Sequence, residues 1–217
     1  MPSSRSGRSM HVIILSWEFP PRIVGKLADH VKDLAMQLVR TNVTTHVVTY
    51  HDFITGEEEE PDGVRTFRVM NPVRTHIGVL TWVLTLNQEV ERVAANIYYN
   101  AKKQISLIDA HDWHFIQAAV TLKKAFFLPF IFSVESLEDH RSKGANHPFN
   151  MAIKSIEWLG LYEAHKVIVK SKWMQDEIIW KYQVPKEKIE VVTPNSKTWI
   201  KDILKIYDSV LGGENRK

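Results

Sequence analysis

Short apolar runs alternate along the chain with segments whose apolar residues recur at helical spacing. Each run is short, rich in β-branched residues and bounded by turn residues, a pattern typical of buried strands. The runs are HVIILS (11–16), THVVTY (45–50), SLIDA (106–110), PFIFSV (129–134), KVIVK (166–170) and KIEVVT (188–193). A further strand, VRTFRVM (64–70), is expected beyond TGEEEEPDG (55–63), which we interpret as a solvated hairpin tip.

Helices are expected between these strands. Their predicted ranges are 26–40, 79–103, 113–124, 149–165 and 172–182. Strand–helix alternation with apolar strands predicts an α/β fold, a single Rossmann-like, doubly wound parallel sheet covered on both faces. With neither an internal repeat nor a break in composition, we expect one domain over 10–195 after a disordered lead-in, 1–9.

The C-terminal segment, 196–217, carries an apolar stripe at helical spacing. The stripe consists of Trp199, Ile200, Ile203, Ile206, Tyr207, Val210 and Leu211. It predicts a helix that packs back on the domain. An unrelated terminal amphipathic helix is the alternative.

Composition narrows the class of protein. The chain has 217 residues, of which 44% are hydrophobic and 24% charged, as in ordinary globular proteins. A net charge of +3 with dispersed basic residues gives no footprint for nucleic acid, and no apolar stretch is long enough for a membrane span. The absence of cysteine excludes thiolate metal sites and favours a cytoplasmic location.

Ligands of such sheets bind beyond the carboxyl ends of the strands, here the segments 17–26, 111–114, 135–141 and 171–172. In the first segment, Gly25 would let backbone amides approach an anion at a helix N-terminus, and Lys26 would add a charge. The alternative is a loop stiffened by Pro20 and Pro21, with Lys26 solvated. No glycine-rich phosphate loop is present, which places an ordinary nucleotide-dependent enzyme last.

The second segment, HDWH, offers groups that suit a sugar. Asp112 or His114 would hydrogen-bond hydroxyls, and Trp113 would stack on a ring face. Asp112 is alternatively an N-cap. His111 and His114 would form only one edge of a metal site, so we expect no metal.

The third segment, SVESLEDHRSKG (133–144), gathers acidic residues after a strand. Glycoside hydrolysis needs two carboxylates at a defined separation, which sequence proximity does not supply. We therefore interpret the segment as a charged surface loop.

These segments together resemble the retaining glycosyltransferases of the glycogen and starch synthase type, with the GT-B fold, especially archaeal members. The resemblance covers about residues 10 to 195. It rests on WEFPPRIVGKL, HDWH, FSVESLEDHR, EAHKVIVKSKWMQDEI and VPKEKIEVVTPN, in this order.

The resemblance implies roles for particular residues. Arg22 and Gly25 would contact the donor's phosphates or glucosyl unit, Asp112 and His114 the transferred sugar, and Ser171 the crevice. The family's donor would be a nucleotide sugar such as ADP- or UDP-glucose, and no other cofactor is implied.

Three departures from the family pattern change this expectation. Lys26 replaces the second glycine of the first loop, and Glu135 replaces a histidine that lines the sugar pocket. After VVTPN the chain continues into the C-terminal stripe, not into a second, donor-binding domain.

The sequence thus predicts the N-terminal half of a GT-B enzyme that binds sugar or glucan and does not transfer glucose on its own. The alternative is an interaction module that forms a homodimer or docks a separate C-terminal domain. A decaying fragment without activity is a further possibility.

Overall fold

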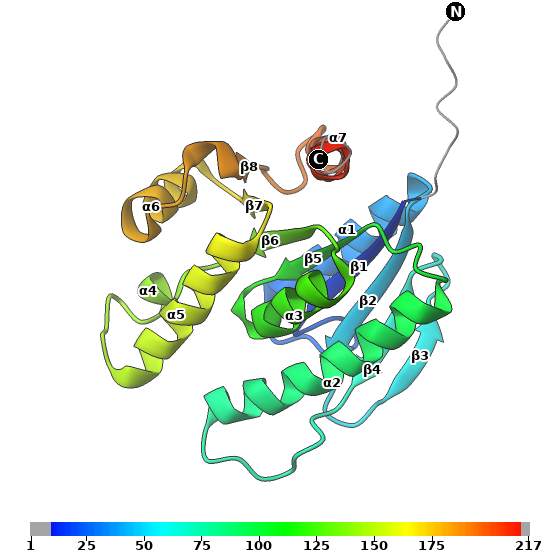
Figure 1. Cartoon of the computed structure of the whole chain (residues 1–217), viewed down its shortest axis with the longest axis horizontal. Coiled ribbons are helices and arrows are strands. Elements are labelled where there is room, and N and C mark those ends of the chain that lie inside the picture. Colours follow the sequence, from blue (N-terminus) through cyan, green and yellow to red (C-terminus); the bar gives the residue numbers. More distant parts are fainter. Residues whose placement is uncertain (1–9, 214–217) are drawn as a thin grey trace, which may run out of the picture.

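The computed structural model describes residues 10–213, so the predicted lead-in over 1–9 lies outside the described residues. One eight-stranded sheet runs through the molecule in the order β3-β4-β2-β1-β5-β6-β7-β8 (Figure 1). All neighbouring strands are parallel except β3 and β4, which are antiparallel. This is the Rossmann-like α/β fold that the strand–helix alternation predicts.

The strands are β1 (His11–Ser16), β2 (Thr44–Tyr50), β3 (Gly56–Glu59), β4 (Arg65–Val69), β5 (Leu107–His111), β6 (Phe130–Val134), β7 (Lys166–Val169) and β8 (Ile189–Val191). The α-helices are α1 (Lys26–Arg40), α2 (Val79–Asn100), α3 (Ile116–Phe126), α4 (Glu138–Arg141), α5 (Pro148–Glu163), α6 (Lys172–Tyr182) and α7 (Trp199–Gly213). Two 3₁₀ turns, Trp113–Phe115 and Lys186–Lys188, complete the described secondary structure.

Two hydrophobic cores lie on opposite faces of the sheet, because successive side chains of a strand point to opposite faces. Ile13 and Leu15 of β1 belong to the core under α2, α3, α5 and α6. Val12 and Ile14 belong to the core under α1 and α7. Figure 1 shows α2, α3 and α5 together in front of the sheet.

Helix α7 closes the second core as expected. Trp199, Ile203, Ile206, Tyr207 and Val210 are all buried there, together with residues of β1 and α1. The apolar stripe at 196–217 is therefore an integral part of the core, and the alternative of an unrelated amphipathic helix is wrong.

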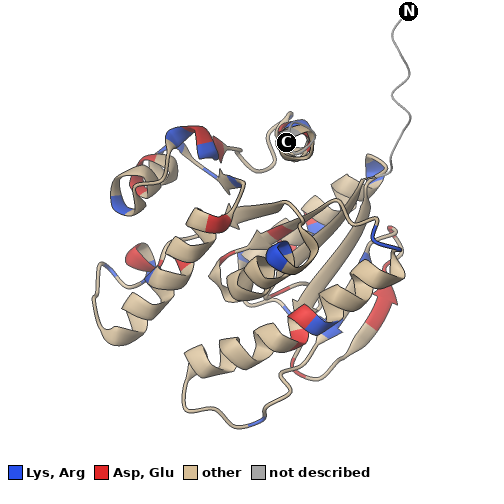
Figure 2. Ribbon diagram, viewed as in Figure 1, with Lys and Arg blue, Asp and Glu red and all other residues tan. Residues whose placement is uncertain are grey.

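The interpretation of 55–63 as a hairpin tip is confirmed for 60–63, the turn between β3 and β4, and is wrong for 56–59. Gly56–Glu59 form β3, paired with β4 at the sheet edge. The glutamates tolerate a strand because they face arginines: Glu58 contacts Arg68 at 2.6 Å, and Glu57 contacts Arg65. Figure 2 shows this acidic edge strand, with Lys and Arg otherwise scattered over the molecule.

Register aligns the strand ends that matter for the site. Ser16 of β1 pairs with His111 of β5, which pairs with Ser133 of β6. Val134 in turn pairs with Val169 of β7. The loops after β1, β5, β6 and β7 therefore leave the sheet from neighbouring points on one edge, here called the rim.

Within residues 10–213, none of the helices combines the length and apolar content that a bilayer crossing requires.

Candidate functional site

The first rim loop supplies its own anion. The Glu18 carboxylate, in a buried residue, accepts hydrogen bonds from the backbone N–H groups of Val24 at 2.6 Å and Gly25 at 2.8 Å. Gly25 is the N-cap of α1, so these donors are at the helix end that we predicted as an anion site. An incoming phosphate would have to displace Glu18.

The cations of this loop differ in their contacts. Arg22 donates to Asp52 at 2.8 Å, and its guanidinium lies over the rings of Trp17 and Tyr50 at 4.5 and 4.7 Å. Lys26 is exposed in the first turn of α1. The structure thus fixes Arg22 in internal contacts and leaves Lys26 facing solvent.

The HDWH segment forms a ring stack at the end of β5. His114 stacks on Trp17 with centroids 4.4 Å apart and on Trp113 at 4.2 Å. Trp113 is buried against Val83 and Ile153. Burial, and the charges of Arg141 and Arg22, lower the pKa of His114 to about 3, so it is a neutral ring. The stack joins the β1 and β5 loops, but Trp113 is too buried to present its face to a sugar ring.

Asp112 is held in an uncommon backbone conformation, with φ 61° and ψ −179°. It precedes the 3₁₀ turn, the position of an N-cap, but Oδ1 has no hydrogen-bond partner. Arg141 lies 3.7 Å from the carboxyl group. Burial outweighs this cation and raises the pKa of Asp112 to about 7. Such a carboxyl group can both donate to and accept from a ligand near neutral pH.

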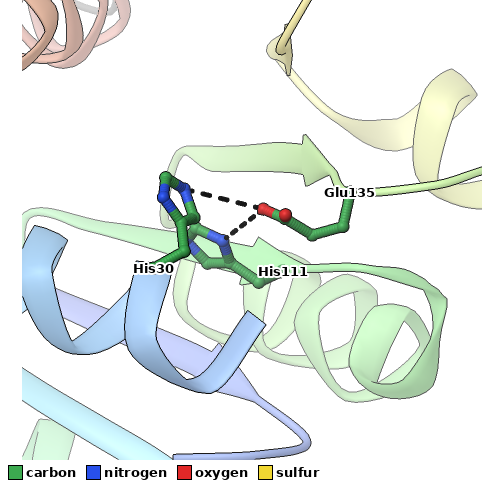
Figure 3. A group of neighbouring side chains, drawn as sticks. All are labelled: His30, His111 and Glu135. Atoms are coloured by element: carbon green, nitrogen blue, oxygen red, sulfur yellow. Dashed lines mark hydrogen bonds and ion pairs between the residues drawn. The ribbon is translucent and has the colours of Figure 1, made fainter. Parts of the chain in front are cut away.

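His111 and Glu135 form the centre of a second cluster (Figure 3). Glu135 Oε1 lies 3.3 Å from His111 Nδ1 and 3.7 Å from His30 Nε2, and Glu135 Oε2 contacts Lys170. Burial would lower the pKa of His111, but the carboxylates of Asp109 and Glu135 outweigh it and raise that pKa to about 9. Burial would raise the pKa of Glu135, but His111 and Lys170 lower it to about 2.

Asp109 lies next to His111 in this cluster and is itself fixed by two hydrogen bonds. It accepts hydrogen bonds from Ser133 Oγ at 2.8 Å and from the Tyr207 hydroxyl of α7 at 2.5 Å. His111 Nε2 lies 3.6 Å from Asp109 Oδ2, without a hydrogen-bond partner. A small cavity of about 20 Å³ lies between the cluster and α7, lined by His30, His111, Glu135, Lys170 and Trp199 among others.

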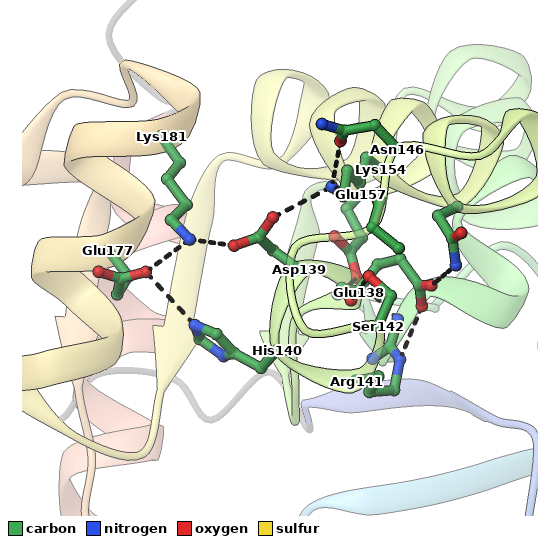
Figure 4. Close-up of polar contacts among 12 residues, drawn as sticks. Glu138, Asp139, His140, Arg141, Ser142, Asn146, Lys154, Glu157, Glu177 and Lys181 are labelled. Atoms are coloured by element: carbon green, nitrogen blue, oxygen red, sulfur yellow. Dashed lines mark hydrogen bonds and ion pairs between the residues drawn. The ribbon is translucent and has the colours of Figure 1, made fainter.

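The acidic segment after β6 is a structural network, and its interpretation as a charged surface loop is wrong for its central residue. Glu138 is buried in α4 and contacts Arg141, which also pairs with the buried Glu157 at 2.8 Å (Figure 4). Asp139 contacts Lys154 at 3.0 Å and also Lys181. These carboxylates have cationic partners, so the network anchors the loop between α5 and α6.

Ser171, predicted to face the crevice, is the N-cap of α6. Its Oγ accepts a hydrogen bond from the Met174 N–H at 3.2 Å. The hydroxyl is therefore engaged with the helix.

A groove of about 470 Å³ lies next to the rim, at the carboxyl ends of β2 and β4. Tyr50, Asp52, His76 and Trp82 are among its lining residues. Trp82 packs edge-on against Trp17 with ring centroids 6.3 Å apart, so the groove adjoins the ring stack. Its volume is within the range of small-ligand sites.

Sequence reasoning missed Glu18, His30, Asp109, Tyr207 and Lys170. Asp109 had a signal, since a carboxylate within an apolar strand requires a partner. His30 had none, because only the fold brings α1 beside the ends of β5 and β6. The structure brings His111 together with Glu135, and Asp112 with Arg141, while Lys26 and Ser171 stay outside these contacts.

The fold is that of the N-terminal half of a GT-B glycosyltransferase. The chain belongs to glycosyltransferase family 4, whose sequence model matches residues 27–194. It is 33% identical over 196 residues to an uncharacterized glycosyltransferase of Methanocaldococcus jannaschii, covering 89% of this chain and 48% of that protein. It is 24% identical over 183 residues to a glycogen synthase of Mycobacterium tuberculosis, covering 78% of this chain and 44% of that protein.

Solved structures share the fold. A sucrose-phosphate synthase from Thermosynechococcus elongatus aligns with a TM-score of 0.66 at 20% identity, over 85% of this chain and 48% of its own. The catalytic domain of starch synthase IV from Arabidopsis thaliana, bound to ADP and acarbose, aligns with a TM-score of 0.59 at 12% identity, over 88% of this chain and 52% of its own. The chain spans about half the length of the curated relatives it matches.

Proposed function

We propose that this chain is the acceptor-binding half of a glycogen synthase-like glycosyltransferase, that it binds an oligosaccharide or glucan at the rim, and that it does not transfer glucose from a nucleotide sugar on its own. Family membership supports the reaction class. The particular substrate and the lack of independent transfer rest on the geometry of the rim.

The observation that carries sugar binding is a set of unpartnered polar atoms between the end of β5 and the first turn of α3. Asp112 Oδ1, His114 Nδ1 and Gln117 Oε1 are shielded from solvent and have no hydrogen-bond partner in the described structure. Buried polar atoms are almost always hydrogen-bonded. Sugar hydroxyls both donate and accept, and would satisfy all three. The adjacent aromatic groove would accommodate further sugar units.

The same rim is unsuited to a nucleotide diphosphate. The amides of Val24 and Gly25 already bind Glu18, and Glu135 adds a second carboxylate. Arg22, Lys170 and Arg141 are each paired with acidic groups. Only half of the cleft that a GT-B enzyme closes over its donor is formed by this lobe, and closure is what excludes water from transfer.

Titration calorimetry with maltohexaose, ADP-glucose and UDP-glucose tests the proposal. We expect maltohexaose to bind, and His114→Ala to weaken it at least tenfold because the ring stack and Nδ1 are both lost. Lys205→Ala, an exposed change on α7, is the matched control and should bind as the wild type does. Absence of maltohexaose binding, or robust glucosyl transfer by the purified chain, would contradict the proposal.

A second candidate function is an interaction module that self-associates or docks a separately encoded C-terminal domain. Apolar side chains exposed at the rim favour it: Ile23 is 57%, Val24 61% and Trp173 59% exposed. Sedimentation of the wild type and of Trp173→Ala tests it. A concentration-dependent dimer that the substitution weakens supports self-association, and a monomer in both cases contradicts it. Trp113→Ala is not a useful probe because Trp113 is buried.

A further inference from the structure

We propose that His30, His111 and Glu135 bind a divalent transition-metal ion, Zn²⁺ or a metal of similar preference, at the base of the rim. The inference is independent of the proposed function. One donor atom from each residue lies within 4.8 Å of the others. Figure 3 shows the two imidazoles and the carboxylate pointing toward one another from α1, β5 and the loop after β6.

The two separations that involve Glu135 are close to those of a tetrahedral site. Bonds of about 2.0–2.1 Å at tetrahedral angles place neighbouring donors about 3.3 Å apart. Glu135 Oε1 lies 3.3 Å from His111 Nδ1 and 3.7 Å from His30 Nε2. Metal binding thus requires the donor nitrogens of the two rings, which lie within 4.8 Å of each other, to approach each other.

The surroundings of His111 are those of a metal ligand. Metal-bound histidines almost always donate the other ring N–H to a carboxylate or a carbonyl. With Nδ1 directed at the metal, Nε2 faces Asp109 at 3.6 Å. Asp109 is itself fixed by Ser133 and Tyr207. His111 Nε2 is buried and has no hydrogen-bond partner, and a bound metal would draw the ring into this arrangement.

The remaining coordination positions and the charge are compatible with an ion. The adjoining cavity of about 20 Å³ is large enough for one water molecule, which would be the fourth ligand. Lys170 contacts the other carboxylate oxygen, Oε2, and leaves Oε1 for the metal. Two imidazoles with one carboxylate favour Zn²⁺ over Mg²⁺, which prefers oxygen ligands.

Titration calorimetry of tag-free full-length chain with ZnCl₂, and visible absorption spectra with CoCl₂, test the site. We expect one equivalent of Zn²⁺ to bind, with four-coordinate Co²⁺ bands. Glu135→Gln and His30→Ala should each weaken binding at least tenfold. Lys170→Ala should strengthen it severalfold, because a cation next to the ligand carboxylate is removed.

His140→Ala is the matched control, since His140 pairs with Glu177 at 3.3 Å elsewhere in the domain. It should bind Zn²⁺ as the wild type does, and circular dichroism without metal checks that all variants fold. If Glu135→Gln or His30→Ala does not fold, the Co²⁺ spectrum of Lys170→Ala still tests the site, because four-coordinate bands are expected only if the three ligands bind the ion. Equal Zn²⁺ affinity in wild type and Glu135→Gln, or six-coordinate Co²⁺ only, would overturn the proposal.

Discussion

At the scale of single residues, Asp112 departs furthest from what local stability favours. Its φ of 61° and ψ of −179° fall in a region that is essentially restricted to glycine. Its carboxyl group is also buried, and it shares Arg141 as counterion with two other acidic residues, Glu138 and Glu157. A strained backbone and an unpartnered carboxyl oxygen in one residue are typical of a binding site, where the side-chain geometry that binding requires is kept although it destabilises the fold.

The raised pKa of Asp112 predicts that Asp112→Asn stabilises the folded state by an amount that depends on pH. The pKa in the folded state is about 7 against 3.8 in the unfolded chain, so the folded state binds the proton more tightly. The contribution of this group to the free energy of unfolding therefore falls as pH rises from about 4 to about 7. The substitution should raise the free energy of unfolding by about 4 kcal/mol at pH 8 and about 1 kcal/mol at pH 4.5, measured by urea denaturation.

Asp112→Gly separates charge from backbone strain. Glycine adopts this conformation freely, so it should add a further gain of about 1–3 kcal/mol that does not depend on pH. If the free energy of unfolding depended on pH in the same way in wild type and Asp112→Asn, burial would not raise the pKa of the Asp112 carboxyl group.

At the scale of elements, α7 contributes a polar contact to the site as well as apolar packing. Tyr207 is fully buried, and its hydroxyl donates to Asp109, which faces His111. The terminal helix thereby fixes the base of the rim from the face of the sheet that α1 and α7 cover.

Tyr207→Phe tests this contact, because it keeps the ring and removes only the hydroxyl. The buried Asp109 carboxylate then loses one of its donors, and hydrogen bonds to charged groups contribute about 1.5–3 kcal/mol. We expect the free energy of unfolding to fall by that amount in urea denaturation. Tyr98→Phe, at a half-buried ring stacked on Phe126, should change it by less than about 0.5 kcal/mol. Equal losses in the two variants would contradict a specific role for Tyr207.

Elements of regular pattern were predictable from the sequence, and contacts across elements were not. The helices at 26–40 and 172–182 begin and end where apolar periodicity places them. Strand β3 was missed because its three glutamates have little strand propensity, and only Arg65 and Arg68 on the neighbouring strand compensate them. His111 and Asp112 follow from strand-end position, whereas Glu18 and His30 contact their partners through loop and helix geometry that no motif encodes.

At the scale of the whole molecule, the sheet is stable only with both faces covered. On the face covered by α1 and α7, Leu107, Ile131 and Ile168 of β5, β6 and β7 belong to the same core as α7. That helix buries five large apolar side chains: Trp199, Ile203, Ile206, Tyr207 and Val210. At about 1.5–3 kcal/mol each, their burial is of the order of 10 kcal/mol, as large as the net stability of about 5–15 kcal/mol of a typical domain.

A chain that ends at Asn195 should therefore fail to fold stably, although residues 10–195 contain every strand of the sheet. We expect circular dichroism to show loss of cooperative thermal unfolding and size-exclusion chromatography to show aggregation, because an apolar face is left uncovered. A synthetic peptide of residues 196–213, added during refolding, should restore the cooperative transition. The same peptide with Ile203→Asp is the matched control and should not, because its charge would enter the core. A truncated chain that melts like the full-length protein would mean that α7 is an accessory to the rim and that the sheet face tolerates solvent.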